Sequence, residues 1–237
     1  MVWTNIFLNI IFFLINGERH ISAFKNSQKN EAISPNSYTN PLIASNCPDP
    51  GVIKLMDGSG WAAVTTSNYA SRAKRSSAFP IRFSKDLVHW TLRSMVFTPA
   101  NWPTWAVDSM WAPELHNVNG RYIVYYTARK TNGVLVSGAA IAENNNPFGH
   151  YVDIGRPLVE GKFGIAIDPH YFKDPITGHD YLLWNQRNLP LLQISHIYLS
   201  QLQPSGVSLK VNNLSQSKHN TKELELSSAK LSSKLGK

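Results

Sequence analysis

Short segments rich in β-branched and aromatic residues alternate with Gly, Pro, Asn and Asp between residues 46 and 206. This pattern is typical of β-strands joined by turns. No stretch of this region keeps a helical period over several turns, so the sequence predicts an all-β fold. The predicted strands are 52–55, 61–66, 81–84, 90–92, 115–118, 122–128, 134–142, 151–153, 170–172, 181–185 and 194–202.

The predicted strands fall into repeated groups. An aromatic strand begins just after each of Gly60, Gly120 and Gly178, at intervals of 60 and 58 residues. A period of this length with three or four short strands predicts the blades of a β-propeller, here about three of them. A β-sandwich with accidental spacing is the alternative.

An acidic residue and a proline stand together ahead of each of these glycines. The pairs are Asp49-Pro50, Pro113-Glu114 and Asp168-Pro169. The first strand of each blade lines the axis of a propeller, so we expect these three carboxylates to converge on one funnel. Paired carboxylates are what a glycosidase needs. Asp-Pro is also common in turns, and we interpret Asp174-Pro175, inside a hairpin loop, as a turn only.

Seven motifs in this region occur in the order known from one enzyme family. They are Asn46-Cys47-Pro48-Asp49-Pro50-Gly51-Val52-Ile53, Ser84-Lys85-Asp86-Leu87-Val88-His89-Trp90, Met110-Trp111-Ala112-Pro113-Glu114-Leu115-His116, Asn119-Gly120-Arg121-Tyr122-Ile123-Val124-Tyr125-Tyr126, Pro147-Phe148-Gly149, Ala166-Ile167-Asp168-Pro169-His170-Tyr171-Phe172 and Ile197-Tyr198-Leu199-Ser200-Gln201-Leu202. Together they resemble glycoside hydrolase family 43. The resemblance covers about residues 46–206 and implies a five-bladed β-propeller that hydrolyses arabinose- and xylose-containing glycans with inversion.

The resemblance also implies roles for individual residues. Asp49 matches the general base that activates water, and Asp168 matches the carboxylate that raises the pKa of the acid and orients it. Trp111 and Glu114 match a motif of the second blade. We expect Trp111 to stack against the sugar, or else to be a core aromatic, and Glu114 to form hydrogen bonds within the funnel.

The general acid of the family is a Glu on the next blade, in a Glu-Gly-Pro or similar context. No such context follows Gly206, where the sequence becomes rich in Ser and Lys. Glu160 precedes Asp168 and lacks the proline, so we interpret it as part of a loop. Glu223 and Glu225 are typical of the first turn of a frayed helix. We therefore expect the acid to be missing from this sequence and hydrolysis to be slowed by about 10²–10⁴.

The remaining segments define the predicted domain organisation. Residues 6–15 form an apolar run of the length of a signal-peptide core, although residues 1–5 contain no Lys or Arg. The sequence thus predicts a signal peptide (1–23), a polar linker (24–45), a partial propeller (46–206) and an unrelated Ser- and Lys-rich tail (207–237). We expect the protein to be secreted and extracellular.

Charge and metal-binding residues exclude several other functions. The net charge is +8, and residues 206–237 supply +4 of it through six lysines and two glutamates. No stripe of Lys and Arg interleaved with aromatics remains, so neither nucleic acid nor a membrane is an expected partner. The single cysteine, Cys47, excludes a disulfide scaffold, and we interpret it as a small buried hydrophobe.

The histidines show no spacing typical of metal ligands, so we expect no metal site and no cofactor. The histidines considered are His116, His170, His179 and His196. Some family members hold a structural cation near the axis through a His on a later blade, and ligands for it are not identifiable in this sequence.

The sequence thus predicts a glycoside hydrolase acting on arabinan, arabinoxylan or xylan. Two alternatives stay open. One is a catalytically inactive glycan-binding module that uses Trp61, Trp105 and Trp111, and the other is a truncated, unstable product with no function of its own.

Overall fold

The computed structural model describes residues 37–161, 164–188 and 195–210. The predicted signal peptide and most of the predicted tail lie outside the described residues. The chain divides into two units, Met1–Pro41 and Leu42–Lys237, and the second contains every described strand. Within the described ranges, no helix has the length and apolar character needed to cross a membrane.

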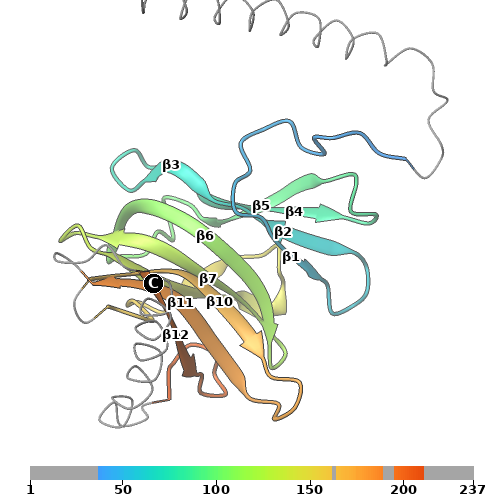
Figure 1. The fold of residues 1–237 in the computed structure, drawn as a ribbon. Helices are drawn as coiled ribbons and strands as arrows, with labels where there is room; N and C mark the ends of the chain where they lie inside the picture. Colours follow the sequence, from blue (N-terminus) through green and yellow to red (C-terminus); the bar gives the residue numbers. More distant parts are fainter. Residues whose placement is uncertain (1–36, 162–163, 189–194, 211–237) are drawn as a thin grey trace, which may run out of the picture. The chain divides into compact units, whose positions relative to one another are not determined.

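The strands form three antiparallel sheets, which follow one another along the chain except that β3 of the second sheet comes between two strands of the first (Figure 1). The first sheet has the order β1-β2-β4-β5, with β1 (Gly51–Lys54), β2 (Trp61–Val64), β4 (Ala78–Ser84) and β5 (Thr91–Phe97). The second has the order β3-β6-β7-β8-β9, with β3 (Ser67–Ser71), β6 (Ala106–Val118), β7 (Arg121–Lys130), β8 (Leu135–Ala142) and β9 (Tyr151–Asp153). The third has the order β10-β11-β12, with β10 (Gly164–Lys173), β11 (Asp180–Asn188) and β12 (Ser195–Gln201). The prediction of an all-β fold is confirmed.

The first strands of the three repeats lie next to one another. β1 contacts β6, and β6 contacts β10, so the sheets pack in chain order around their inner strands. This is the arrangement of successive propeller blades. We call β1, β6 and β10 the inner strands.

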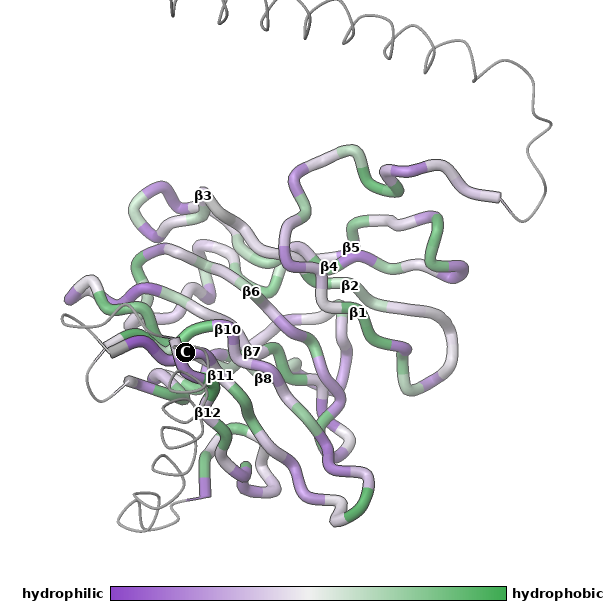
Figure 2. Tube along the Cα trace, in the orientation of Figure 1, coloured by the Kyte–Doolittle hydropathy of each residue, from purple (hydrophilic) through white to green (hydrophobic). Residues whose placement is uncertain are grey.

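Strand β7 belongs to two hydrophobic cores at once. Its side chains alternate between the two faces of the sheet, as in any strand. Tyr122, Val124 and Tyr126 pack in the core between the first and second sheets. Ile123 and Tyr125 pack in the core shared with the third sheet. Tyr122–Ala128 are all buried, as expected for a strand that is covered on both faces, and Figure 2 shows hydrophobic and hydrophilic residues interspersed along the strands.

The third sheet buries only one of its faces in the described structure. Leu182 and Trp184 of β11 pack in the core shared with the second sheet. Phe172, Ile197 and Leu199, whose side chains alternate with that face, are 45%, 73% and 58% exposed. The third sheet therefore presents an apolar face that lacks a fourth sheet among the described residues.

Residues 207–210, predicted as part of the tail, pair back onto the third sheet. Leu202 forms a β-bridge with Leu209, and the Lys210 amide donates to the Gln201 carbonyl. Val207 and Leu209 pack against the core that the third sheet shares with the second. The segment after Gly206 thus continues the third sheet for a few residues.

Two inner strands are longer than predicted, and β3 was not predicted at all. β6 begins at Ala106 rather than at residue 115, and β10 begins at Gly164 rather than at residue 170. In both strands the pairing is interrupted near a proline, which cannot donate to the ladder. This interruption hides the alternating pattern in the sequence.

Candidate active site

The same unusual backbone conformation occurs two residues before β1 and within β6 and β10. Asp49, Ala112 and Asp168 each precede a proline and have a positive φ, of 51°, 42° and 56°. This left-handed conformation is uncommon for residues other than glycine. The sequence placed Glu114 in register with the two aspartates, and that alignment is wrong by two residues. Ala112 has the equivalent position, so the second sheet carries no carboxylate there.

A threonine links the first sheet to the second at this point. The Thr66 amide donates to the Pro48 carbonyl at 3.0 Å, and the Thr66 hydroxyl donates to Oδ2 of Asp49 at 2.5 Å. The hydroxyl oxygen in turn accepts the Ala112 amide at 2.7 Å. Thr66 is buried, so this hydroxyl holds both the Asp49 carboxylate and the Ala112 amide of β6 in place.

A second threonine links the second sheet to the third in the same way. Thr127 of β7 lies opposite Trp111, the residue before Ala112, just as Thr66 lies opposite Pro48. Its hydroxyl oxygen accepts the Asp168 amide at 2.9 Å. Thr66 and Thr127 are therefore equivalent residues of successive sheets.

Asn185 has this same position in the third sheet. It lies opposite Ile167, the residue before Asp168. Its Oδ1 atom is buried and has no hydrogen-bond partner within the described part of the chain. In the third sheet Asn185 thus offers an acceptor at the position of Thr66 and Thr127, but no described backbone amide donates to it.

The two aspartates influence each other electrostatically. Partial removal from water raises the pKa of Asp168, the negative charge of Asp49 raises it further, and the positive charge of Arg187 opposes both effects. Both aspartate residues are exposed on the surface. The arrangement thus brings two carboxylates from sheets far apart in sequence into one solvent-accessible site.

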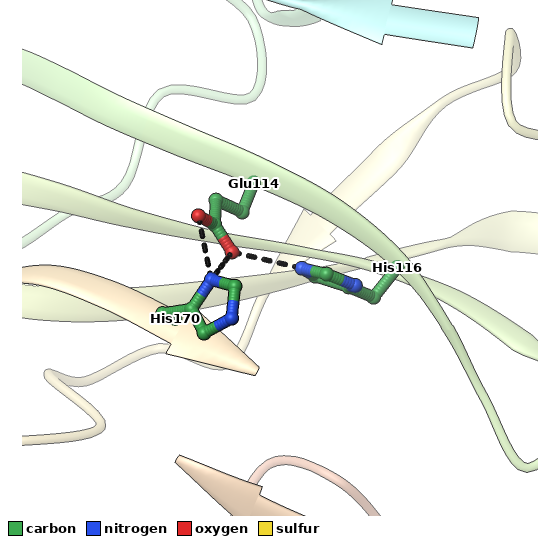
Figure 3. Close-up of side chains that lie close together, drawn as sticks. All are labelled: Glu114, His116 and His170. Carbon is green, nitrogen blue, oxygen red and sulfur yellow. Dashed lines mark hydrogen bonds and ion pairs between the residues drawn. The ribbon is translucent and has the colours of Figure 1, made fainter. Parts of the chain in front are cut away.

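Glu114 lies between two histidines (Figure 3). Glu114 and His116 alternate along β6 and so point to the same face, while His170 comes from β10. Glu114 Oε2 lies 2.9 Å from Nε2 of His116 and 2.8 Å from Nδ1 of His170. Burial raises the pKa of Glu114, but the two histidine hydrogen bonds outweigh it and the net pKa is lowered. Glu114 is therefore already engaged by two neighbours.

The three tryptophans expected to serve glycan binding differ in their surroundings. Trp111 is half-buried on β6. The Lys54 ammonium lies 6.0 Å from the centre of the Trp61 ring. The Trp105 ring stacks on Tyr126, and its N–H donates to Asp153 at 3.0 Å. Trp105 therefore packs within the second sheet, contrary to the expectation that it faces a sugar.

A cleft lies beside Thr66 and is rich in hydroxyl groups. Its lining residues are Asn46, Thr66, Ser67, Tyr69, Ala70, Ser76, Ser77, Pro80 and Met95. The side chain of Tyr69 is largely exposed there. The cleft thus combines several hydroxyl groups with one exposed aromatic ring.

Other residues considered in the sequence have structural roles or lie outside the described ranges. Glu160 pairs with Lys130 at 2.8 Å in the loop before β10. Cys47 is half-buried, with its sulfur 3.5 Å from the Ser45 hydroxyl. Glu223 and Glu225 lie outside the described residues.

Sequence reasoning missed the threonines, Asn185 and the histidine pair. Thr127 and Asn185 each follow a repeat glycine, Gly120 and Gly178, by seven residues, and Thr66 follows Gly60 by six. Aligning the repeats on their glycines would have found them. The histidine pair has no such signal, because His116 and His170 meet only through the packing of β6 on β10.

Sheets packed around their inner strands, with Asp49 and Asp168 at equivalent positions of the first and third sheets, define a β-propeller of the glycoside hydrolase class. The sequence model of "Glycosyl hydrolases family 43" matches residues 38–231. The chain belongs to this family.

Two similar proteins are named an arabinofuranosidase and an arabinanase. An extracellular exo-α-(1→5)-L-arabinofuranosidase of Streptomyces avermitilis is 28% identical over 166 residues, which are 64% of this chain and 30% of the relative. An extracellular endo-α-(1→5)-L-arabinanase 1 of Bacillus subtilis is 33% identical over 85 residues, or 33% of this chain and 24% of the relative. The chain thus spans about a third or less of these relatives.

Solved structures agree on the fold. A thermostable family-43 glycoside hydrolase superimposes with a TM-score of 0.62 at 26% identity, covering 74% of this chain and 55% of the other. An endo-arabinase of Bacteroides thetaiotaomicron superimposes with a TM-score of 0.58 at 18% identity, covering 74% and 57%. This likeness confirms the prediction of a partial propeller.

Proposed function

We propose that this chain is the part of an inverting glycoside hydrolase that carries the general base, and that it acts on arabinose- or xylose-containing glycans. The observation that carries this proposal is the pair Asp49 and Asp168, which lie just before β1 and within β10, share the same backbone conformation before a proline and interact electrostatically. The names of the two curated relatives favour arabinan as the substrate. Because both relatives are named extracellular, the proposal includes secretion.

Asp49 accepts a proton from the attacking water in this proposal. The water then adds to the anomeric carbon from the face opposite the leaving group, which inverts the configuration. The Thr66 hydroxyl holds one carboxylate oxygen of Asp49, so the other oxygen is directed to the water. A fixed carboxylate avoids the cost of orienting the base during the reaction.

Asp168 acts beside the general acid rather than on the water. A negative charge near a carboxylic acid raises the pKa of that acid and keeps it protonated. Trp111 stacks against the sugar in this proposal, and Glu114 completes the funnel through the hydrogen bonds that it forms with His116 and His170.

The general acid has no candidate among the described residues, since Glu160 is engaged by Lys130 in a loop. A substrate with a strongly acidic leaving group does not need protonation, so it tests the base alone. We therefore choose 2,4-dinitrophenyl α-L-arabinofuranoside and the corresponding β-D-xyloside as substrates for the full chain.

The experiment compares wild type with Asp49→Asn and with a matched control, Asp174→Asn. Asp174 also precedes a proline, but it closes the hairpin between β10 and β11. We expect measurable turnover by wild type, a loss of at least about 100-fold in Asp49→Asn, and unchanged turnover in Asp174→Asn.

Equal turnover by wild type and Asp49→Asn would refute the assignment of the base. A folded wild type that quenches its tryptophan fluorescence with arabino-oligosaccharides but turns over neither activated glycoside would replace the hydrolase by a glycan-binding module. Circular dichroism of each variant verifies that the compared proteins are folded.

A further inference from the structure

We propose that Glu114, His116 and His170 bind a divalent transition-metal ion, best matched by Zn²⁺, between the inner strands β6 and β10. The sequence led us to expect no metal site, because these residues show no ligand spacing within one segment. The three residues are also not the later-blade histidine through which some family members hold a cation.

The geometry of the three residues is that of a preformed ligand set. One ligand atom from each lies within 4.8 Å of the other two. Glu114 and His116 are two residues apart on one strand, which places both side chains on one face. His170 faces them from the neighbouring inner strand, and both imidazole rings direct a nitrogen at the Glu114 carboxylate (Figure 3).

The donor chemistry selects the kind of ion. Two imidazole nitrogens and one carboxylate oxygen are ligands of Zn²⁺ and of similar ions such as Co²⁺. Ca²⁺ and Mg²⁺ prefer oxygen ligands throughout, so they fit this set poorly. Three protein ligands leave a coordination position for water.

The site is accessible from solvent and spans two sheets. The side chains of Glu114, His116 and His170 are 29%, 22% and 55% exposed, which gives an ion a route of entry. Because the ligands come from β6 and β10, a bound ion joins the second sheet to the third. Metal binding of this kind stabilises the folded state by mass action.

The test measures Zn²⁺ binding by the full untagged chain, with Cys47→Ser as the background to remove the single thiol. Isothermal titration gives the stoichiometry, and thermal unfolding with and without Zn²⁺ gives the effect on stability. We expect one Zn²⁺ per chain and a higher unfolding temperature with the ion. Co²⁺ added in place of Zn²⁺ should give the visible absorption bands of a low-coordinate site.

Variants locate the site. His170→Ala and Glu114→Gln should each weaken Zn²⁺ binding at least tenfold and abolish the Co²⁺ bands. The matched control is His150→Ala. His150 also pairs with a glutamate, Glu143, at 3.2 Å, but within the described residues this pair is not part of a cluster of three potential ligands. We expect Zn²⁺ affinity in the control equal to that of the background.

Two results would overturn the proposal: no stoichiometric Zn²⁺ binding by the background protein, or equal affinity in the background, His170→Ala and Glu114→Gln. His170 is more than half exposed, so its replacement should not prevent folding, and the Co²⁺ spectrum reports the site without any assay of turnover. Failure here would leave the assignment of Asp49 untouched, since that rests on a different measurement.

Discussion

The junction between the first and second sheets and the junction between the second and third differ in one hydrogen bond. Thr66 and Thr127 have equivalent positions, and each accepts the amide of the residue before the proline in the next inner strand. Only Thr66 also donates to a carboxylate, because the residue before the proline is Asp49 in its own sheet and Ala112 in the sheet of Thr127.

This difference separates the scaffold of the propeller from its chemistry. The amide-to-threonine bond recurs irrespective of the residue before the proline, so it belongs to the packing of the sheets. The carboxylate bond occurs where we propose the general base. Replacing the two threonines in parallel therefore distinguishes a loss of stability from a loss of catalysis.

The largest effect is expected for Thr66→Val. Valine has the same shape but no hydroxyl, so the half-buried Ala112 amide loses its acceptor at a cost of about 1–3 kcal/mol in the free energy of unfolding. Asp49 also loses its fixed orientation, and kcat on the activated arabinoside should fall about 10- to 100-fold with little change in KM. Thr66→Ser keeps the hydroxyl and should retain most of the activity. Unchanged kcat in Thr66→Val would contradict a positioning role.

Thr127→Val should cost a similar free energy of unfolding, about 1–3 kcal/mol, because the Asp168 amide loses its acceptor. The loss in kcat should be smaller than in Thr66→Val, since Thr127 does not bond a carboxylate. Urea unfolding and turnover, measured on both variants together, check this. A larger loss of kcat in Thr127→Val would show that Asp168 matters more than Asp49.

Asp180 provides a second polar contact across the junction between the second and third sheets. It accepts hydrogen bonds from Asn119 at 2.9 Å and from Tyr171 at 2.7 Å. Burial raises the pKa of Asp180, but the bonds from Tyr171, Lys173 and Asn119 outweigh it and the net pKa is lowered. An aspartate with a lowered pKa stabilises the folded state above about pH 4 and loses this effect as the pH falls further.

Asp180→Asn should therefore lower the free energy of unfolding by about 1–2 kcal/mol at pH 7. The difference from wild type should shrink as the pH falls below about 4. Urea unfolding at a series of pH values measures it, and a difference that stays constant down to pH 3 would rule out the ionised carboxylate as its source.

Asn185→Leu should have the smallest effect and the opposite sign. Its Oδ1 atom is buried and has no hydrogen-bond partner in the described structure. An apolar side chain of similar size therefore removes a buried polar group without breaking a hydrogen bond of that atom. We expect the free energy of unfolding to stay equal or rise by up to about 1 kcal/mol. A loss of more than that would mean that Asn185 has a partner in solution.

The parts of the fold that were predicted are those with a local pattern. β7 was found within two residues of each end, because its apolar residues are continuous and bounded by a glycine. β3 was missed because Ser67–Ser71 has no apolar alternation and exists as a strand through its pairing with β6. A strand buried on both faces, such as β7, shows a continuous apolar run in the sequence. A strand that depends on pairing with a distant segment, such as β3, shows no local pattern.

The candidate site divides in the same manner. Asp49 and Asp168 stand out because proline marks both of them in the sequence. Glu114 was aligned wrongly because it follows Pro113, whereas Asp49 and Asp168 each precede a proline. The residue that precedes Pro113 is Ala112. His170 could not be grouped with Glu114 and His116, since only the contact of β6 with β10 brings it to β6.

The sharing of β7 between two cores makes this strand the last of the described strands to open. The amides of β7 exchange with solvent only when both cores are lost, while the third sheet opens when one core is lost. β12, with Ile197 and Leu199 exposed, should therefore exchange fastest and β7 slowest. Local stability should thus be highest in β7, at the centre of the three sheets, and lowest in β12, at their edge.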